Sequence, residues 1–358
     1  MNSVLPPERA DATGHRLSVL VYSLDRHPFL RRQIVYWSDK PVDLLIADGS
    51  QNPLDVSTIT WSGLMRLSYH HAPGPRNVNL RMKWLVSHAS TPYVVFVDDQ
   101  DTCLWSAATR IMRFLDNNAD YVSASASIFC RYEKYRFWSY DDGGFDIDHA
   151  DPGARVVDAW RHNSPIARLA YAIMRAPVAR VLYDARPVVD FDFEVASDLL
   201  FFVSPFIAGK HRAFTFPALW RVDGSQPRGN WRARAYDGNV VLDKRTLNDS
   251  IERLCVTNNV RRADHDTVIE LIAGIWLAQE SLVPKTPIEP TWWAARLAEV
   301  KSFTRIRSRI KHWLRKDRDI RPLEFFTRKG GLERDQIEDL QNLQSILDRY
   351  PDGVSANS

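Results

Sequence analysis

The sequence is short of cysteine, and the few cysteines it has are far apart. They are Cys103, Cys130 and Cys255. An odd number at such wide spacing forms neither a disulfide framework nor a CxxC metal clip. The sequence therefore predicts a protein of a reducing, cytoplasmic compartment.

The chain also lacks long apolar runs and an excess of one charge. Its longest uncharged apolar stretches, near residues 199–208 and 271–278, are far shorter than the roughly 20 residues that cross a bilayer. The first residues show no basic segment followed by an apolar one, so we expect no cleaved signal peptide. A net charge of +3 is too small to indicate nucleic-acid binding. We therefore expect neither a membrane-spanning protein nor a nucleic-acid partner.

What the chain does contain is ordinary globular composition. Of its 358 residues, 45% are hydrophobic and 25% charged, enough for one large domain with an appendage. The pattern divides it into a loose polar arm (1–15), a segment of alternating strands and helices (16–230) and a helical C-terminal region (231–358). A final amphipathic helix is predicted over residues 332–350.

Three apolar runs predict buried strands in the first half of the chain. They cover residues 17–24, 42–47 and 93–97, and helical spacing predicts helices over 29–37 and 79–89. Strand, helix and strand within such short distances form parallel, right-handed units. The sequence predicts an α/β fold with a mostly parallel sheet.

Two of these strands end in carboxylates. Asp48 closes one, and Asp98, Asp99 and Asp101 follow the other. Crowded carboxylates repel unless a positive charge lies between them. Ligands bind at this edge of open α/β sheets, and Mg²⁺ and Mn²⁺ prefer oxygen ligands. The alternative is an acidic helix cap and a solvated turn. Because two acidic strand ends share one edge, we favour a divalent cation with a nucleoside diphosphate.

A further acidic segment lies near residue 198. Residues 188–195 alternate like a half-buried strand, and residues 196–203 are predicted to be helical with Asp198 in the first turn. Phe201 and Phe202 would partly desolvate Asp198 and raise its pKa, which suits a general base. The alternative is a carboxylate that complements the helix dipole. Glu194 is the second candidate for the base.

Two other segments leave alternatives open. The aromatic-rich region 131–186 is interpreted either as an acceptor-binding flap or as a surface loop or hairpin. Residues 299–316 form a basic helix with an apolar face. This helix either contacts an anionic membrane surface or packs on its own domain with its cationic face in solvent.

The order and spacing of five segments resemble those of the inverting glycosyltransferases of family 2, in a bacterial surface-polysaccharide subgroup. The segments are LSVLVYSL, LLIADGS, VVFVDDQD and the later pairs Gly209-Lys210 and Trp220-Arg221. The resemblance covers about residues 16–225. It implies the GT-A fold, a Rossmann-like, mixed and mostly parallel sheet flanked by helices, here with a helical C-terminal extension. It further implies a UDP-sugar donor, a glycan or lipid-linked acceptor, a Mn or Mg divalent cation, and a cytoplasmic location that includes the inner face of the plasma membrane.

The resemblance also implies roles for single residues. The loop with Asp25 and Arg26 would lie under the nucleotide. The remaining nucleotide contacts would come from Asp48 (base or ribose), Arg81 and Lys83 (base or phosphates) and Asp98 (diphosphate). Separately from the resemblance, Arg221 is a candidate for binding the diphosphate or a charged acceptor, and the alternative is a structural arginine after an aromatic strand. The cation would be held by Asp99 and Asp101, and Asp198 would be the general base.

Three positions depart from the family pattern. Gln100 stands at the third position of the acidic cluster, so the metal pair is either Asp99 with Asp101 or a weakened Asp98-x-Gln100. Ser197 replaces the first acid of the Glu-Asp pair. Asp223 replaces the histidine that often follows the late arginine, and it could still bind the metal.

Two other functions compete with sugar transfer. A sugar nucleotidyltransferase has a related fold but needs a glycine-rich basic loop after the first strand, and residues 23–26 (SLDR) contain no glycine. A non-catalytic GT-A scaffold at the membrane surface is suggested by Gln100 and Ser197. It would retain its function when the carboxylates are mutated.

Overall fold

The computed structural model describes most of the N-terminal two thirds of the chain and one C-terminal helix. The described residues are 14–74, 78–132, 136–140, 144–161, 171–185, 200, 204–223, 240–262, 265–266, 268–270 and 332–350. For residues 130–132, 136–140, 157, 160–161, 221–223 and 240–244 the structure describes the backbone alone. Asp198, Glu194, residues 1–13 of the predicted arm and the basic segment 299–316 lie outside the described residues, and the predictions about them stay predictions.

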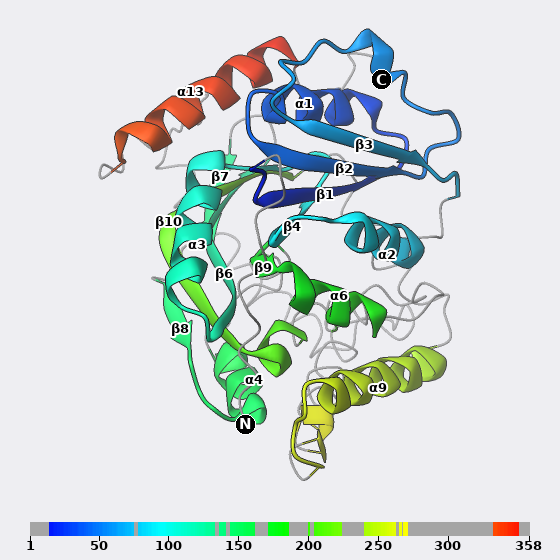
Figure 1. Ribbon diagram of the computed structural model, residues 1–358, viewed down its shortest axis with the longest axis vertical. Coiled ribbons are helices and arrows are strands. Elements are labelled where there is room, and N and C mark those ends of the chain that lie inside the picture. The colour runs from blue at the N-terminus through cyan, green and yellow to red at the C-terminus, as the bar shows by residue number, and fades with distance from the viewer. Residues whose placement is uncertain are drawn as a thin grey trace, which may run out of the picture.

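A ten-stranded sheet forms the centre of the molecule (Figure 1). Its main path runs β3-β2-β1-β4-β9-β6-β10-β5, with β7 beside β6 and β8 beside β10. The strands are β1 (Leu17–Ser23), β2 (Val42–Asp48), β3 (Arg66–His71), β4 (Tyr93–Asp98), β5 (Thr102–Cys103), β6 (Tyr121–Tyr132), β7 (Arg136–Tyr140), β8 (Phe145–Ile147), β9 (Ile173–Arg175) and β10 (Lys210–Asp223).

Seven α-helices accompany the sheet in the part of the chain that the structure describes. They are α1 (His27–Trp37), α2 (Val78–His88), α3 (Trp105–Asn117), α4 (Pro152–Arg161), α6 (Ala176–Asp184), α9 (Val240–Thr257) and α13 (Arg334–Arg349). A short 3₁₀ turn covers Val56–Thr58. Helix α1 has Pro28 in its first turn, where the missing N–H costs nothing.

The sheet has a hydrophobic core on each face. Side chains alternate along a strand, so Leu17, Val19 and Val21 of β1 face one core and Leu20 faces the other. The first core receives α1, α3 and α13, and the second receives α2, α4, α6 and α9. This two-sided cover explains why β1, β2 and β4 are nearly continuous apolar runs.

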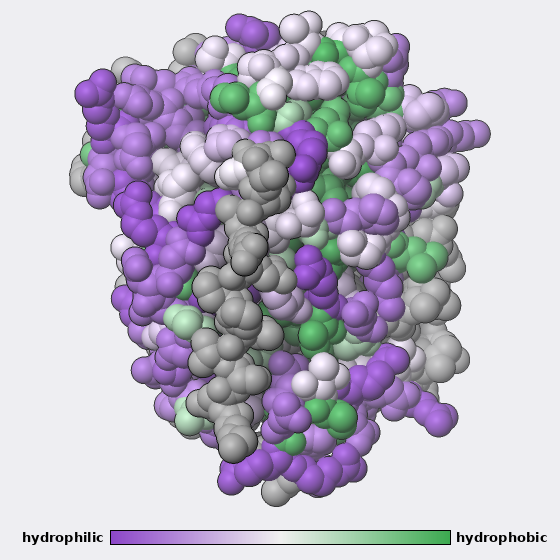
Figure 2. All heavy atoms as spheres, viewed as in Figure 1, coloured by the Kyte–Doolittle hydropathy of each residue, from purple (hydrophilic) through white to green (hydrophobic). Residues whose placement is uncertain are grey.

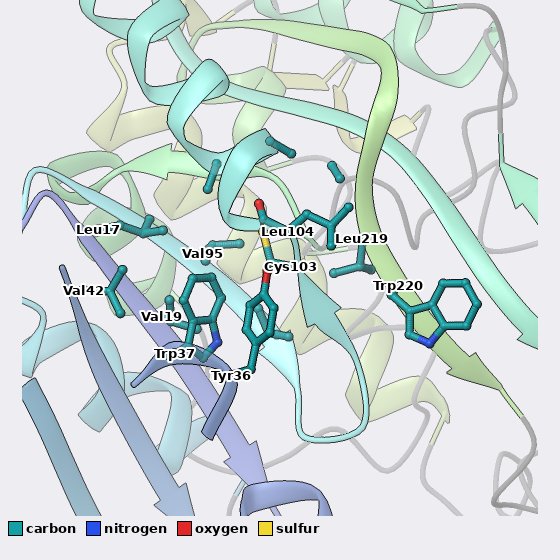
Figure 3. Packing of buried hydrophobic residues seen from close by; sticks show 14 of the residues in the cluster. Leu17, Val19, Tyr36, Trp37, Val42, Val95, Cys103, Leu104, Leu219 and Trp220 are labelled. Carbon is teal, nitrogen blue, oxygen red and sulfur yellow. Dashed lines mark hydrogen bonds between the residues drawn. The ribbon is translucent and has the colours of Figure 1, made fainter. Parts of the chain in front are cut away.

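The first core is packed around two aromatic residues of α1. Tyr36 and Trp37 are fully buried, and their rings meet edge to face at 4.9 Å between centroids. Figure 3 shows them side by side over β1, with Cys103 behind Tyr36 and Val19 and Val42 around Trp37. This core fixes α1 on the sheet, and α1 in turn carries the first residues of the candidate site.

One short strand breaks the parallel order. Strands β1 to β4 pair with one another in parallel, whereas β9 is antiparallel to both β4 and β6. It therefore lies between the two halves of the sheet. This arrangement makes the sheet mixed, as expected. Neither β9 nor the helices α4 and α6 were anticipated from the sequence, because short elements carry little periodic signal, whereas α9 lies in the region predicted to be helical.

Two further features concern the region after β6 and the end of β3. Strands β6 and β7 form an antiparallel pair, and β8, α4, β9 and α6 follow within region 131–186, whose role as an acceptor-binding flap stays a prediction. His70 and His71 are the last two residues of β3. They pair with Ala47 and Asp48 of β2. The sheet extends β3 because its neighbour β2 continues to Asp48.

Helix α13 packs across α1 and α3 at the upper left of Figure 1. Leu340 and Leu343 are completely buried in the first core, while the face of α13 turned to the viewer in Figure 2 is hydrophilic. Helix α13 thus completes the first hydrophobic core, to which β1 also contributes. Within the described residues no helix has the length and hydropathy needed to cross a bilayer.

Candidate functional site

The carboxyl ends of β1, β2 and β4 meet at one edge of the sheet. In register, Ser23 of β1 lies opposite Asp48 of β2, and Tyr22 of β1 lies opposite Asp98 of β4. The loops that follow these strands carry most of the described residues expected in the site. Their side chains are linked to one another rather than dispersed.

The acidic segment after β4 is a tight turn. The Asp101 N–H donates to the Asp98 carbonyl at 3.0 Å, which makes Asp98 and Asp101 its first and fourth residues. The Tyr171 hydroxyl lies 2.7 Å from Asp98 Oδ2 and 2.5 Å from Asp101 Oδ2. Tyr22 donates to the other oxygen, Asp98 Oδ1, at 2.6 Å. The turn therefore brings Asp98 together with Asp101.

Asp99 points to a different set of partners. Its carboxylate accepts from the Ser23 hydroxyl at 2.6 Å and from the Arg26 guanidinium at 3.2 Å. Burial raises the pKa of Asp99 to about 6, although Ser23 and Arg26 both oppose the shift. Arg26 also donates to the side-chain oxygen of Gln100 at 3.2 Å. Arg26 thus joins the loop after β1 to the acidic turn.

Helix α1 holds the backbone of the acidic turn. The Gln33 side-chain amide is completely buried and donates to the main-chain oxygens of Asp99, at 3.1 Å, and Asp101. Its own oxygen accepts from the indole of Trp37 at 3.1 Å. Arg32, one residue earlier, donates to the main-chain oxygen of Gln100. Two adjacent polar residues inside the first core therefore fix the turn.

Asp48 is completely buried and organises the loop that follows β2. One oxygen accepts from the Ser50 N–H at 2.9 Å and from the Ser50 hydroxyl. The other accepts from Tyr69 at 2.6 Å and lies 3.2 Å from His27 Nε2. Burial alone would raise the pKa of Asp48, but the bonds from Ser50 and Tyr69 hold it below its ordinary value. The described contacts of Asp48 are all with protein.

Ser50 connects this loop to the loop after β1. Its hydroxyl accepts from the Asp25 N–H at 2.7 Å. Asp25 has φ of +56°, a left-handed conformation that aspartate tolerates better than most residues. The Asp25 side chain is exposed at the rim of the site. The loop predicted to lie under the nucleotide is thus fixed through its backbone.

The two basic residues of α2 point in different directions. Arg81 is buried, and its Nη1 donates to the Gly74 oxygen at 2.7 Å. Gly49 lies against the Arg81 guanidinium so closely that a Cβ there would be 2.5 Å from Nη1. The Lys83 ammonium is 3.5 Å from the main-chain oxygen of Asp184, at the end of α6. Arg81 therefore joins the loop after β2, whereas the described contact of Lys83 is with α6.

Strand β10 reaches the same edge of the sheet from the other side. Trp220 pairs with Thr102, the residue directly after Asp101. The next backbone positions, Arg221 to Asp223, therefore continue past the acidic turn. Their side chains lie outside the described set, so the predicted roles of Arg221 and Asp223 stay predictions.

The oxygen atoms around Tyr171 suit a hard divalent cation. Asp98 and Asp101 each direct one carboxylate oxygen to the same point, and oxygen ligands are those that Mg²⁺ and Mn²⁺ prefer. Nowhere in the described ranges do three or more His, Cys, Asp or Glu side chains gather as a metal site. Of the predicted metal ligands, Asp101 belongs to this pair, whereas the described contacts of Asp99 are with Ser23 and Arg26.

Several residues of the site carried no sequence signal of their own. Tyr171, Gln33, His27 and Tyr69 reach it from β9, α1 and β3. Of these four residues, Gln33 alone could have been noticed in the sequence, because it is a polar residue at a helix position that faces the core. Nothing in the local sequence distinguishes Tyr171 from other tyrosines.

Comparison with solved structures supports the fold. The chain aligns with S. aureus TarS 1–349 at a TM-score of 0.51 and 14% identity, covering 94% of this chain and 91% of that one. Full-length S. aureus TarS aligns at 0.50 and 13%, covering 94% of this chain and 55% of that one. The 1–349 fragment in complex with UDP aligns at 0.49 and 13%, with coverages of 94% and 91%.

The sequence itself matches no family model and no curated protein. At this identity the structural likeness establishes the fold. The expected α/β fold of the GT-A type, with a parallel core, flanking helices and a C-terminal helix, is confirmed.

Proposed function

We propose that this protein is a glycosyltransferase that moves a sugar from a nucleoside-diphosphate donor to an acceptor hydroxyl with inversion. The observation that carries the proposal is the linked edge of the sheet. In one tight turn at the carboxyl ends of β1 and β4, Asp98 and Asp101 share the Tyr171 hydroxyl, and Asp99 binds Ser23 and Arg26. This edge is the ligand-binding edge of open α/β sheets, and the GT-A-type fold supports the assignment.

The donor would be a UDP-sugar, bound between the loops after β1 and β2. His27 is part-exposed beside the buried Asp48, so we place the base or ribose near His27, with Asp48 orienting its ring. Arg26 lies beside Gln100 and is also part-exposed, which suits a contact with the diphosphate. Asp25 and Arg81 would shape the loops on either side of the nucleotide.

A Mn or Mg divalent cation would stabilise the negative charge that develops on the leaving diphosphate. Asp98 and Asp101 would be its carboxylate ligands, with Asp223 as a further candidate. Asp101 is completely buried, and such a carboxylate is costly unless it is paired or bound to a metal. Asp99 would support the turn through Ser23 and Arg26.

Asp198 is proposed as the general base, with Glu194 in reserve, on the resemblance alone. The base must take the proton of the acceptor hydroxyl on the side opposite the leaving group. The acceptor class, a glycan or lipid-linked molecule of surface polysaccharide synthesis, is proposed on the same basis. Residues 299–316 would then bring the enzyme to the inner face of the membrane.

One observation favours the non-catalytic alternative. The described carboxylates of the acidic turn all have protein partners, and in the described part of the chain no set of three ligands is preformed. A scaffold that has lost its cation would show the same feature. Nucleotide and cation binding separate the two proposals.

Calorimetric titration of nucleoside diphosphates, first with Mn²⁺ and then with chelator, tests the proposal. We expect one nucleotide, UDP in the first place, to bind with Mn²⁺ and to bind much more weakly with chelator. Asp101→Asn and Asp198→Asn should each lower sugar transfer or donor hydrolysis at least a hundredfold without loss of folding.

Asp120→Asn is the matched control. Asp120 is exposed and pairs with Lys210 away from the site, so its removal should leave turnover unchanged. Normal turnover by both site variants would refute the transferase. Binding of no nucleotide would favour the scaffold.

A further inference from the structure

Tyr171 occupies the point where two carboxylates of the acidic turn converge. Its hydroxyl oxygen lies 2.7 Å from Asp98 Oδ2 and 2.5 Å from Asp101 Oδ2. A phenol has one hydrogen, so it cannot donate a full hydrogen bond to both carboxylates at once. The hydroxyl can therefore donate fully to one of the two carboxylates at a time, whereas a cation between them would attract both.

The sheet places Tyr171 at this point. Strand β9 pairs Arg175 with Tyr93 and Met174 with Val94, so the antiparallel register carries Tyr171 to the end of β4, beside Asp98. The Arg175 guanidinium anchors β9 by donating to the main-chain oxygens of Tyr121 at 2.9 Å and Leu115 at 2.6 Å. The phenol ring is thus held at its base by the sheet, while its hydroxyl end is only part-buried.

We propose that the Tyr171 hydroxyl holds the place of the divalent cation between Asp98 and Asp101, and that cation binding displaces it. Tyr171 is then a positioning residue that keeps the two carboxylates in their cation-binding arrangement when the cation is absent. The inference rests on the cation of the proposed function and assigns a role to a residue outside the expected ligand set.

The distances imply that a cation bound between Asp98 and Asp101 displaces the Tyr171 hydroxyl, because there is no room for both. Mg²⁺ binds oxygen at about 2.0–2.1 Å, closer than either carboxylate oxygen now lies to the hydroxyl. A cation on the line between Asp98 and Asp101 would therefore take the space of the hydroxyl oxygen. The hydroxyl must move aside and give up both contacts, so the wild-type protein loses part of its cation affinity to this competition.

The test is Mn²⁺ affinity, measured on the full chain by calorimetry and by the electron paramagnetic resonance of free Mn²⁺. Tyr171→Phe removes the competing hydroxyl and leaves the ring. Hydrogen bonds to charged groups are strong, so we expect Tyr171→Phe to bind Mn²⁺ about tenfold more tightly than wild type.

Tyr22→Phe is the matched control. It also removes a phenol hydroxyl from Asp98, but from Oδ1, whereas Tyr171 contacts Oδ2. That bond can persist beside a bound cation, so Tyr22→Phe should not tighten Mn²⁺ binding. Equal tightening in both variants would overturn the inference.

Thermal unfolding supplies a readout that does not depend on turnover. In chelator, Tyr171→Phe should melt below wild type, because the two carboxylates repel without their shared donor. Saturating Mn²⁺ should then raise its melting temperature by more than it raises that of wild type, since tighter binding stabilises the folded state more. A rise equal to or smaller than that of wild type would overturn the inference.

The outcomes separate this inference from the proposed function. Unchanged or weaker Mn²⁺ binding by Tyr171→Phe, or no binding by either protein, overturns the role of Tyr171, whereas UDP binding and sugar transfer decide the transferase independently. Tighter Mn²⁺ binding without any nucleotide binding would support the role of Tyr171 and refute the transferase.

Discussion

Helix α13 contacts the sheet domain through a buried carboxylate as well as through its leucines, and removal of this carboxylate offers a sharp test of the fold. Asp339 accepts from the Tyr36 hydroxyl at 2.7 Å and from the Ser106 N–H and hydroxyl at 2.9 and 3.0 Å. Tyr36 in turn accepts from the Trp105 N–H at 3.0 Å. Because Leu104, the N-cap residue of α3, makes no side-chain capping bond, Asp339 supplies the cap from the far end of the sequence.

The expected cost of Asp339→Ala is about 3 kcal/mol of unfolding free energy. Hydrogen bonds to a charged group contribute about 1.5–3 kcal/mol each, but three bonds to one carboxylate are not additive, and removal of the carboxylate also relieves the cost of its burial. The substitution leaves the buried Tyr36 hydroxyl and the first turn of α3 without their acceptor. This loss outweighs the relief.

Urea unfolding of the full chain, followed by circular dichroism, measures this cost. Asp335→Ala is the matched control, because Asp335 lies one turn earlier on α13 and its bond to Arg110 is solvent-exposed. That pair should contribute less than about 1 kcal/mol. If Asp339→Ala costs no more than Asp335→Ala, the buried network does not hold α13 in place and the reasoning is refuted.

Two further predictions concern the loop after β2 and the alkaline limit of stability. Gly49→Ala should lower the unfolding free energy by about 1–2 kcal/mol, because the new methyl group displaces Arg81 from the Gly74 oxygen. In an Arg81→Ala background, urea unfolding should show almost no further loss of unfolding free energy from Gly49→Ala. A full additional loss in that background would contradict this explanation. Burial, with Asp339 alongside, raises the pKa of Tyr36 well above its ordinary value of 10.0, so the unfolded state binds fewer protons above pH 10 and stability falls as the pH rises. Tyr36→Phe should make that fall shallower by up to about 1.4 kcal/mol per pH unit, and identical slopes from urea unfolding at pH 9 to 11 would exclude this cause.

The local sequence is sufficient to predict three central strands of the first half. Residues 17–24, 42–47 and 93–97 are apolar on both faces, and the structure covers both faces of β1, β2 and β4 with helices. The chain order then places Asp48 and Asp98 at one edge, because parallel strands end on the same side. The α/β class and the position of the site therefore follow from patterns within a few residues.

The partners within the site depend on tertiary structure. A two-residue spacing suggested Asp99 with Asp101, but the hydrogen-bonded turn pairs Asp98 with Asp101 and sends Asp99 towards Ser23 and Arg26. Side-chain directions in a turn follow its backbone angles, and spacing in the sequence does not specify them.

The remaining contacts join residues that are far apart in the sequence, and local patterns do not predict them. Tyr171 reaches the acidic turn because β9 runs antiparallel between β4 and β6, and Asp339 meets Tyr36 across 303 residues. Local periodicity determines which face of an element is apolar, and so predicts that the face will be buried. Which polar groups meet inside is decided when the elements pack, because a buried donor is stabilised only by the acceptor that the whole fold brings to it.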